Sequence, residues 1–94
     1  MRQNPHDSAR AYPRLKVFRP AEVRTSDGAV RVHLLDVSCG GAWIHAAVPL
    51  PVGTTLVLTC LGRRRTAEVA WVKESRCGIR FNSPLTSEEL AALL

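Results

Sequence analysis

The sequence contains no long hydrophobic run, and it has few aromatic residues and few cysteines. No apolar stretch approaches the roughly 20 residues of a membrane-spanning helix, and the N-terminal residues are polar, unlike a secretion signal. Cys39, Cys60 and Cys77 are odd in number and far apart, which predicts neither a disulfide framework nor a zinc site. We therefore expect a cytoplasmic protein with reduced thiols and no membrane insertion.

The sequence also lacks the residue patterns on which catalysis rests. It has no Ser-His-Asp arrangement, no paired catalytic carboxylates and no glycine-rich phosphate loop. His6, His33 and His45 are not spaced like metal ligands, and we expect them on the surface. These absences predict a protein that is not an enzyme and holds no metal and no cofactor.

The residues that are present suffice for one small domain. A chain of 94 residues, 46% hydrophobic and 22% charged, can close one core but has little room for a second module. Its net charge is +5, and eleven of its 13 basic residues are arginine. The planar guanidinium group matches phosphate oxygens and the edge of guanine. The composition therefore favours a phosphate-bearing or nucleotide partner.

Most of the chain alternates between apolar and polar residues, the period of a β-strand. We expect six strands, close to residues 15–25, 30–36, 42–48, 54–61, 66–73 and 76–81. Ser26-Asp27-Gly28 is a turn that joins the first two strands into a hairpin. Thr86 and Glu89 match a capping box, which predicts a short helix over about 86–94 that covers one mouth of the barrel. Strands at this spacing indicate an antiparallel barrel or sandwich.

Two arginines lie just before the first expected strand. Arg10 and Arg14 are four residues apart and follow residues 1–9, which we expect to be a flexible tail. From there they can present two forked donors to a ligand. About one such pair is expected by chance, and Arg76 with Arg80 forms another, so position rather than spacing distinguishes the N-terminal pair.

The segment from Asp36 to Gly41 combines a carboxylate, a hydroxyl and two glycines at the end of a hydrophobic strand. A carboxylate accepts hydrogen bonds from guanine N1 and N2, a hydroxyl can donate to phosphate, and glycine lets the backbone approach a ligand closely. The same residue types also build ordinary β-turns, which is the alternative interpretation of the segment taken alone.

Arg10-Ala-Tyr-Pro-Arg14, followed by Asp36-Val-Ser-Cys-Gly-Gly41, resembles the two-part signature of PilZ domains, Arg-x-x-x-Arg and Asp/Asn-x-Ser-x-x-Gly. The segments 69–72 and 77–81 resemble the last two strands of that family. The resemblance implies a six-stranded antiparallel β-barrel with a C-terminal helix over residues 10–94, acting as a receptor for cyclic di-GMP. Carried over residue by residue, the ligand-binding positions are Arg10, Arg14, Asp36, Ser38 and Gly41.

The resemblance also implies how the ligand is recognised. Arg10 and Arg14 would grip guanine edges or phosphates, and Asp36 would read the Watson–Crick edge. Ser38 would hold phosphate, and Gly41 would make room. An arginine fork favours guanine over adenine by about 1–3 kcal/mol per bidentate pair, so cyclic di-AMP should bind poorly.

Many family members carry a further arginine directly before the first motif arginine, which favours binding of a stacked ligand pair. Ala9 occupies that position here, and we expect one ligand per chain. Beyond the ligand we expect a downstream protein partner, because a lone domain without an output module acts through another molecule.

Two other functions suit the composition. Some PilZ relatives are adaptors that bind a protein and no nucleotide, but both arginines and the Asp-x-Ser pair argue against this. A basic barrel can also bind nucleic acid, although few aromatics are present for base stacking, and we expect no nucleic acid polymer.

Two further groups have plain structural interpretations. We interpret Arg63–Arg65 as a solvated hairpin tip that adds electrostatic attraction. Trp43 and Trp71 are expected as core or barrel-surface aromatics rather than base-stacking platforms. Tyr12 lies inside the arginine motif and is the aromatic residue of most interest for ligand binding.

Overall fold

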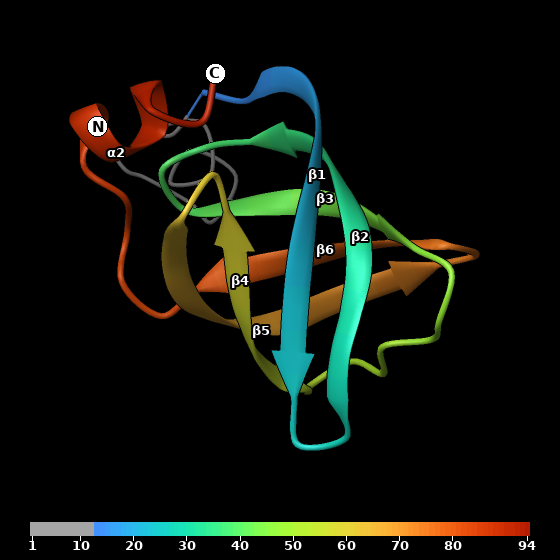
Figure 1. Cartoon of the computed structure of the whole chain (residues 1–94). Helices are drawn as coiled ribbons and strands as arrows, with labels where there is room; N and C mark the ends of the chain where they lie inside the picture. Colours follow the sequence, from blue (N-terminus) through green and yellow to red (C-terminus); the bar gives the residue numbers. More distant parts are fainter. Residues whose placement is uncertain (1–12) are drawn as a thin grey trace, which may run out of the picture.

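The computed structural model describes residues 13–94, which form a closed barrel of six antiparallel strands (Figure 1). The expected fold class is confirmed. The elements along the chain are β1 (Leu15–Thr25), β2 (Gly28–Val37), β3 (Gly41–Ala46), β4 (Thr55–Cys60), β5 (Arg63–Lys73), β6 (Arg76–Phe81) and the helix α2 (Ser87–Ala91). Around the barrel the order is β1-β2-β3-β6-β5-β4, and β4 pairs back with β1. The expected tail, residues 1–9, lies outside the described residues.

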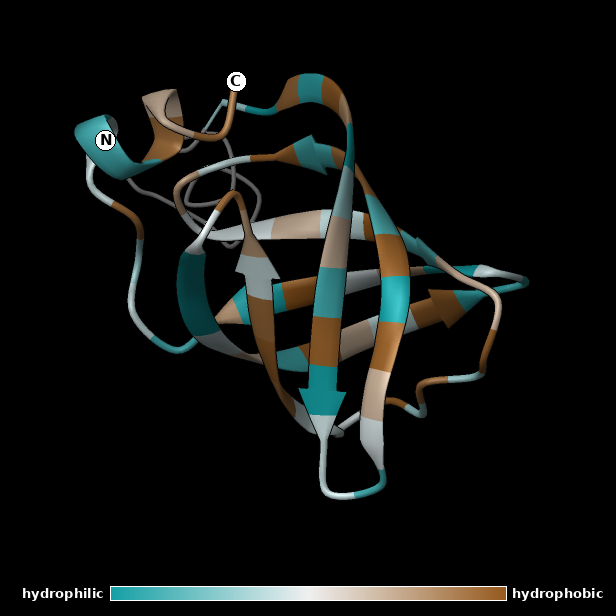
Figure 2. Cartoon of the chain, viewed as in Figure 1, coloured by the Kyte–Doolittle hydropathy of each residue, from teal (hydrophilic) through white to brown (hydrophobic). Residues whose placement is uncertain are grey.

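The alternation in the sequence becomes an inner and an outer surface. Successive side chains of a strand point to opposite faces, so one set fills the barrel and the other meets solvent. The most deeply buried side chains are Val23, Leu34, Ile44, Leu56 and Val69, each at most 1% exposed. The ribbon accordingly shows bands of opposite hydropathy along several strands (Figure 2). One continuous core therefore holds the domain together.

Tight turns set where the strands begin and end. The hairpin of β1 and β2 closes at Thr25 and Gly28, as the sequence predicts. Leu61 and Gly62 both have positive φ, 52° and 78°, the geometry of a two-residue hairpin turn. This turn lets Arg63 pair with Cys60. β5 consequently starts three residues before the expected Thr66.

The interpretation of Arg63–Arg65 as a solvated hairpin tip is therefore corrected. All three residues belong to β5, and Arg63 and Arg64 are exposed strand residues. Arg65 is half-buried, and its Nη2 lies 2.6 Å from Glu89 Oε1. The two-residue turn places Arg63–Arg65 in the sheet. Alternation along β5 then directs the side chain of Arg65 toward the barrel mouth.

The C-terminal helix covers one end of the barrel (Figure 1). The capping box is confirmed: Thr86 Oγ1 accepts from the Glu89 backbone N–H, and Glu89 accepts from the Thr86 N–H. Leu85 and Leu93 are buried against the core, and Arg19 Nε donates to the Leu93 carbonyl at 2.7 Å. The helix itself is shorter than the expected 86–94.

Candidate functional site

Two β-bulges create a row of polar and aromatic residues on the outside of the barrel. In β2, Leu34 pairs with Ile44 but Asp36 pairs with Trp43, so Leu35 is an extra residue. In β5, Val69 pairs with Ile79 but Trp71 pairs with Gly78, so Ala70 is extra. After an extra residue, each following side chain of that strand points to the opposite face of the sheet from the one that strict alternation would give it. We call the resulting outward set, Asp36, Trp43, Gly78 and Trp71, the outer row.

Arg14 lies directly over this row. Its Nε is 3.9 Å from Asp36 Oδ1, and its Cζ lies 4.3 Å from the ring centroid of Trp43. Trp43 in turn meets the edge of Trp71, with 5.1 Å between ring centroids and an interplanar angle of 88°. A cation above an indole face is attracted by the ring quadrupole. Arg14 is therefore held by a carboxylate and an aromatic ring while half of its side chain stays exposed.

Trp71 covers the backbone of β6 at Gly78. A Cβ added at Gly78 would lie 2.0 Å from Trp71 Nε1, so the indole rests on the glycine without any gap for a side chain. A glycine inside a strand often marks such a close approach. The two tryptophans and this glycine form a flat apolar floor beside Arg14.

Asp36 is a buried carboxylate with spare acceptor capacity. Desolvation raises its pKa above the usual value, although Arg14, a hydrogen bond from the Trp43 backbone and Lys16 act in the opposite direction. No hydrogen-bond donor within residues 13–94 reaches its Oδ1. An unpaired buried acceptor is costly, and a donor supplied by a ligand would relieve that cost.

The segment between β2 and β3 is a tight loop closed by Ser38. Ser38 Oγ accepts from the backbone N–H groups of Gly40 and Gly41, both at 3.2 Å, and the Ser38 N–H donates to the Gly41 carbonyl at 2.8 Å. A Cβ at Gly41 would lie 2.2 Å from the carbonyl oxygen of Ile79. Both motif residues thus have a structural task in addition to any contact with a ligand.

A cavity of about 530 Å³ opens over the outer row and this loop. Its volume falls in the range of about 300–1,000 Å³ that is usual for small-molecule sites. Its polar and aromatic lining residues come from the segment just before β1, the loop, β3, β5 and β6, and they are Arg14, Ser38, Trp43, Trp71, Arg80 and Phe81. The apolar floor of Trp43, Trp71 and Gly78 and the cations Arg14 and Arg80 together suit a ligand that combines flat rings with negative charge.

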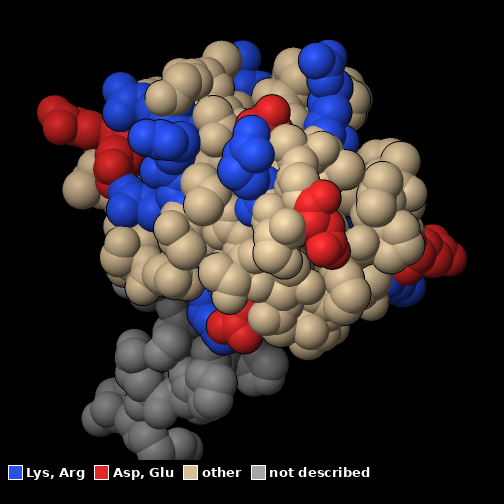
Figure 3. Space-filling model, turned by 60° about the horizontal axis from the view of Figure 1, so that its bottom comes forward, with Lys and Arg blue, Asp and Glu red and all other residues tan. Residues whose placement is uncertain are grey.

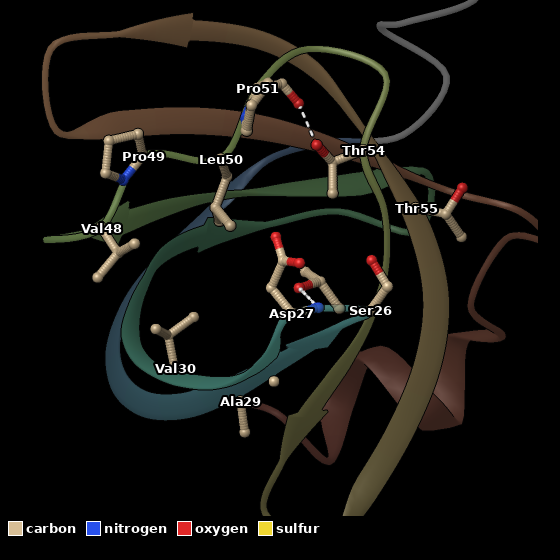
Figure 4. Close-up of a pocket in the computed structure, with 12 residues that line it drawn as sticks. Ser26, Asp27, Ala29, Val30, Val48, Pro49, Leu50, Pro51, Thr54 and Thr55 are labelled. Carbon is tan, nitrogen blue, oxygen red and sulfur yellow. Dashed lines mark hydrogen bonds between the residues drawn. The ribbon is translucent and has the colours of Figure 1, made fainter.

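A second cavity of about 660 Å³ lies at the end of the barrel opposite α2, between the β1–β2 hairpin and the segment from Val48 to Thr55. Ser26 and Asp27 face Leu50 and Thr54 across it (Figure 4). Among its lining residues, all of them in the described part of the chain, Asp27 is the one charged side chain. Although it is the larger cavity, it offers no cation to a phosphate, and we assign the site to the smaller one.

Positive charge is widespread on the surface. The view of the lower end of the barrel shows lysine and arginine side chains on several sides, densest in one group with a few carboxylates beside it (Figure 3). Such a field attracts anions generally and does not by itself locate a site. Within residues 13–94, no group of three or more His, Cys, Asp and Glu side chains could hold a metal ion, and no helix could span a membrane.

Four of the five residues expected from the sequence lie in or beside the cavity. Arg14, Ser38 and Gly41 line it, and Asp36 is in contact range of Arg14. Arg10 lies outside the described residues. That these residues bind a ligand stays a prediction.

The lining residues that the sequence interpretation did not assign to the ligand site include Trp43, Trp71, Gly78 and Arg80. Both tryptophans were expected as core or barrel-surface aromatics, and the structure places them on the barrel surface, where they line the cavity. The signal that could have found this face was Gly78, an isolated glycine within an apolar strand.

The family model described as PilZ domain matches residues 8–94. No curated protein matches the chain. Among solved structures, the PilZ domain of CeSA from a cellulose-synthesizing bacterium is 19% identical, with a TM-score of 0.62, covering 86% of this chain and 90% of that one.

The inhibitor of motility MotI/DgrA of Bacillus subtilis is 14% identical, with a TM-score of 0.69 over 99% of this chain. The chain spans about half, 49%, of that protein's length. At these identities the two structures support the fold, and the family model supplies the family. Because that model matches nearly the whole sequence, the chain belongs to the PilZ domain family.

Proposed function

We propose that this chain is a non-enzymatic receptor for cyclic di-GMP, the ligand of the receptor family to which it belongs. One observation carries the proposal: Arg14 is held between Asp36 and Trp43 at the rim of a cavity of suitable volume. Cyclic di-GMP has two guanines and two phosphates, so it needs both cations and flat apolar surfaces. The cavity offers both.

Recognition of guanine would rest on Arg14 and Asp36. Arg14 can donate to O6 and N7 of the base, a pattern that adenine cannot match because it carries a donor at position 6. The carboxylate of Asp36, whose side chain keeps 12% of its surface exposed, suits the N1 and N2 donors of guanine. The indole rings of Trp43 and Trp71 supply the surface against which a purine can pack.

Phosphate recognition would involve the motif arginines and the Ser38 loop. Arg10, four residues before Arg14, is proposed as the second forked donor. The Ser38 hydroxyl already accepts two backbone hydrogen bonds, so we propose that it acts mainly by fixing the loop shape. We keep one ligand per chain as the proposed stoichiometry, since Ala9 replaces the arginine that favours a ligand pair.

We propose that ligand binding changes the surface of the domain and that this change transmits the signal. Binding through Arg10 and Arg14 would draw the N-terminal segment onto the cavity, and a cytoplasmic protein partner would read the result. Limited proteolysis with and without cyclic di-GMP tests this step. Protection of the bonds before Arg14 by the ligand is expected, and an unchanged cleavage rate contradicts the relay.

The experiment that tests the receptor itself is isothermal titration with cyclic di-GMP, with cyclic di-AMP and GTP as controls. Quenching or a shift of tryptophan fluorescence gives a second readout, because both tryptophans line the cavity. We expect selective binding that is lost in Arg14→Ala. No binding by well-folded protein would overturn the proposal and favour a PilZ adaptor that binds protein alone.

A further inference from the structure

Arg80 is an arginine at the cavity that belongs to neither of the two sequence motifs. It lies on β6, between Gly41 of β3 and Glu68 of β5 in the pairing of the strands. Together with Arg14 and Ser38 it lines the cavity of about 530 Å³. Gly78, two residues earlier on the same strand, belongs to the floor that carries Trp71. The cavity therefore has a cation from β6 in addition to Arg14.

In the free protein the charge of Arg80 is only loosely held. Its Nη2 lies 3.6 Å from Glu68 Oε1, and the two side chains are 68% and 46% exposed. An exposed pair at this distance contributes little, because water screens it and both side chains lose freedom to form it. The pair of Arg65 and Glu89 differs, since it is shorter, at 2.6 Å, and more buried. Arg80 is thus free to exchange partners at little cost.

A ligand with two phosphates needs charge compensation at more than one point. Arg14 is already shared between Asp36 and Trp43, so its guanidinium cannot neutralise two separated anions. A forked guanidinium binds a phosphate more strongly than a monodentate carboxylate contact of this length. Besides Arg14, Arg80 is the cation among the described residues that line the cavity, and the geometry points to it as a phosphate contact in addition to the motif arginines.

We propose that Arg80 is a third ligand-binding arginine, which exchanges the carboxylate of Glu68 for a phosphate of the bound nucleotide. This inference rests on the proposed function, because the phosphate is that of cyclic di-GMP. Glu68 then opposes binding, because its carboxylate competes with the phosphate for Arg80. The pair sets the affinity of the site without being part of either motif.

The chain supplies a matched control on the same strand. Arg76 is four residues from Arg80 on the same outer face and is exposed in the same way. Four residues of strand span about 13 Å. This exceeds the screening length of about 8 Å at physiological salt, so loss of the Arg76 charge should act weakly at the site.

The test is titration of cyclic di-GMP into the whole chain and its variants at physiological salt. We expect Arg80→Gln to weaken binding about tenfold, as for loss of one charge-assisted contact, and Arg76→Gln to change it by less than about twofold. Glu68→Gln should strengthen binding roughly two- to threefold. That gain should vanish when Glu68→Gln is combined with Arg80→Gln, because the competitor then has nothing to compete for.

The outcomes separate this inference from the receptor proposal. Equal effects of Arg80→Gln and Arg76→Gln, with tight binding by the wild type, overturn the role of Arg80 and leave the receptor intact. A gain from Glu68→Gln that persists without Arg80 overturns the exchange. No binding by folded wild-type protein overturns both. Circular dichroism of each variant shows that an affinity change does not reflect unfolding.

Discussion

The carboxylate of Asp36 is buried by the fold and only partly compensated by Arg14 at 3.9 Å. Because burial raises its pKa, the folded chain holds the proton more tightly than the unfolded chain does. Stability from this group is therefore largest in acid and declines as the pH rises above the ordinary value of 3.8. At neutral pH the ionised carboxylate destabilises the domain.

Asp36→Asn should consequently act in opposite directions on stability and on binding. We expect the variant to unfold at a higher temperature than the wild type at pH 7, with the difference shrinking toward pH 4. Its affinity for cyclic di-GMP should fall about tenfold or more, since an amide presents only one acceptor to the guanine edge. Thermal unfolding at both pH values and titration at pH 7 are the measurements. A less stable variant at pH 7 would show that the Arg14 contact outweighs desolvation.

Neither Gly41 nor Gly78 has room for a side chain, but the neighbouring group that blocks it differs, and so does the expected effect of a substitution. At Gly41 the obstacle is the backbone oxygen of Ile79, which moves only if β6 moves. At Gly78 the obstacle is the Trp71 ring, which can rotate away. We expect Gly41→Ala to cost at least about 2 kcal/mol of unfolding free energy in urea.

Gly78→Ala is the control for this comparison. It should cost less and should instead shift the tryptophan emission, as the Trp71 ring leaves its place against Trp43. Equal losses of stability from the two substitutions, without a spectral change in Gly78→Ala, would show that neither contact is as rigid as described.

At the scale of elements, the carboxylate of Glu89 makes two contacts that help to hold the α2 helix against the barrel. Glu89 caps the helix through the Thr86 backbone and pairs with Arg65, and the Thr86 hydrogen bond is the main cause of its lowered pKa. A lowered carboxyl pKa means that the stabilisation is present above the ordinary value of 4.5 and is lost as the pH falls through the lowered value.

We therefore expect acid to loosen the helix before the barrel. Amide exchange over α2 should accelerate as the pH falls below about 4.5, after correction for intrinsic rates, and Glu89→Gln should show fast exchange already at pH 7. Glu88→Gln is the matched control, because Glu88 lies in the same first turn and is exposed. Similar behaviour of the two variants would mean that the first-turn charge matters and the capping contact does not.

The elements themselves could be predicted well from the sequence, and the bulges at Leu35 and Ala70 could not. Alternation located all six strands, and the capping box located the start of the helix. Trp71 continued the alternation of Ala67 and Val69, so nothing in the pattern signalled that Ala70 is an extra residue. Alanine is small enough to suit either face, and Leu35 in β2 is equally uninformative. The motif residues located the candidate site in the sequence. The position of the two tryptophans beside it depends on the strand register that the bulges set, which the sequence did not reveal.

At the scale of the whole molecule, stability depends on a single core. Ile44 is fully buried at its centre, and no second cluster within residues 13–94 could hold part of the barrel if the first were lost. Ile44→Ala should cost about 2–5 kcal/mol, a large share of the roughly 5–15 kcal/mol that typical domains possess.

Unfolding of this variant should remain one cooperative transition, with tryptophan fluorescence and far-ultraviolet circular dichroism changing together. Val72→Ala, at a position 43% exposed near the end of β5, should change stability by less than about 0.5 kcal/mol. Separate transitions for the two probes would indicate that one half of the barrel is stable alone.

The two bulges at Leu35 and Ala70 also limit which sequence changes this domain can accept, in evolution or in protein engineering. Substitution can alter what the outer row binds, because each side chain there is replaceable without disturbing the count of residues. Deletion of Leu35 or Ala70 would instead turn the residues beyond it inward and bring former core residues to the surface. A graft of this site onto another barrel must therefore transfer the two inserted residues, Leu35 and Ala70, together with the outer row.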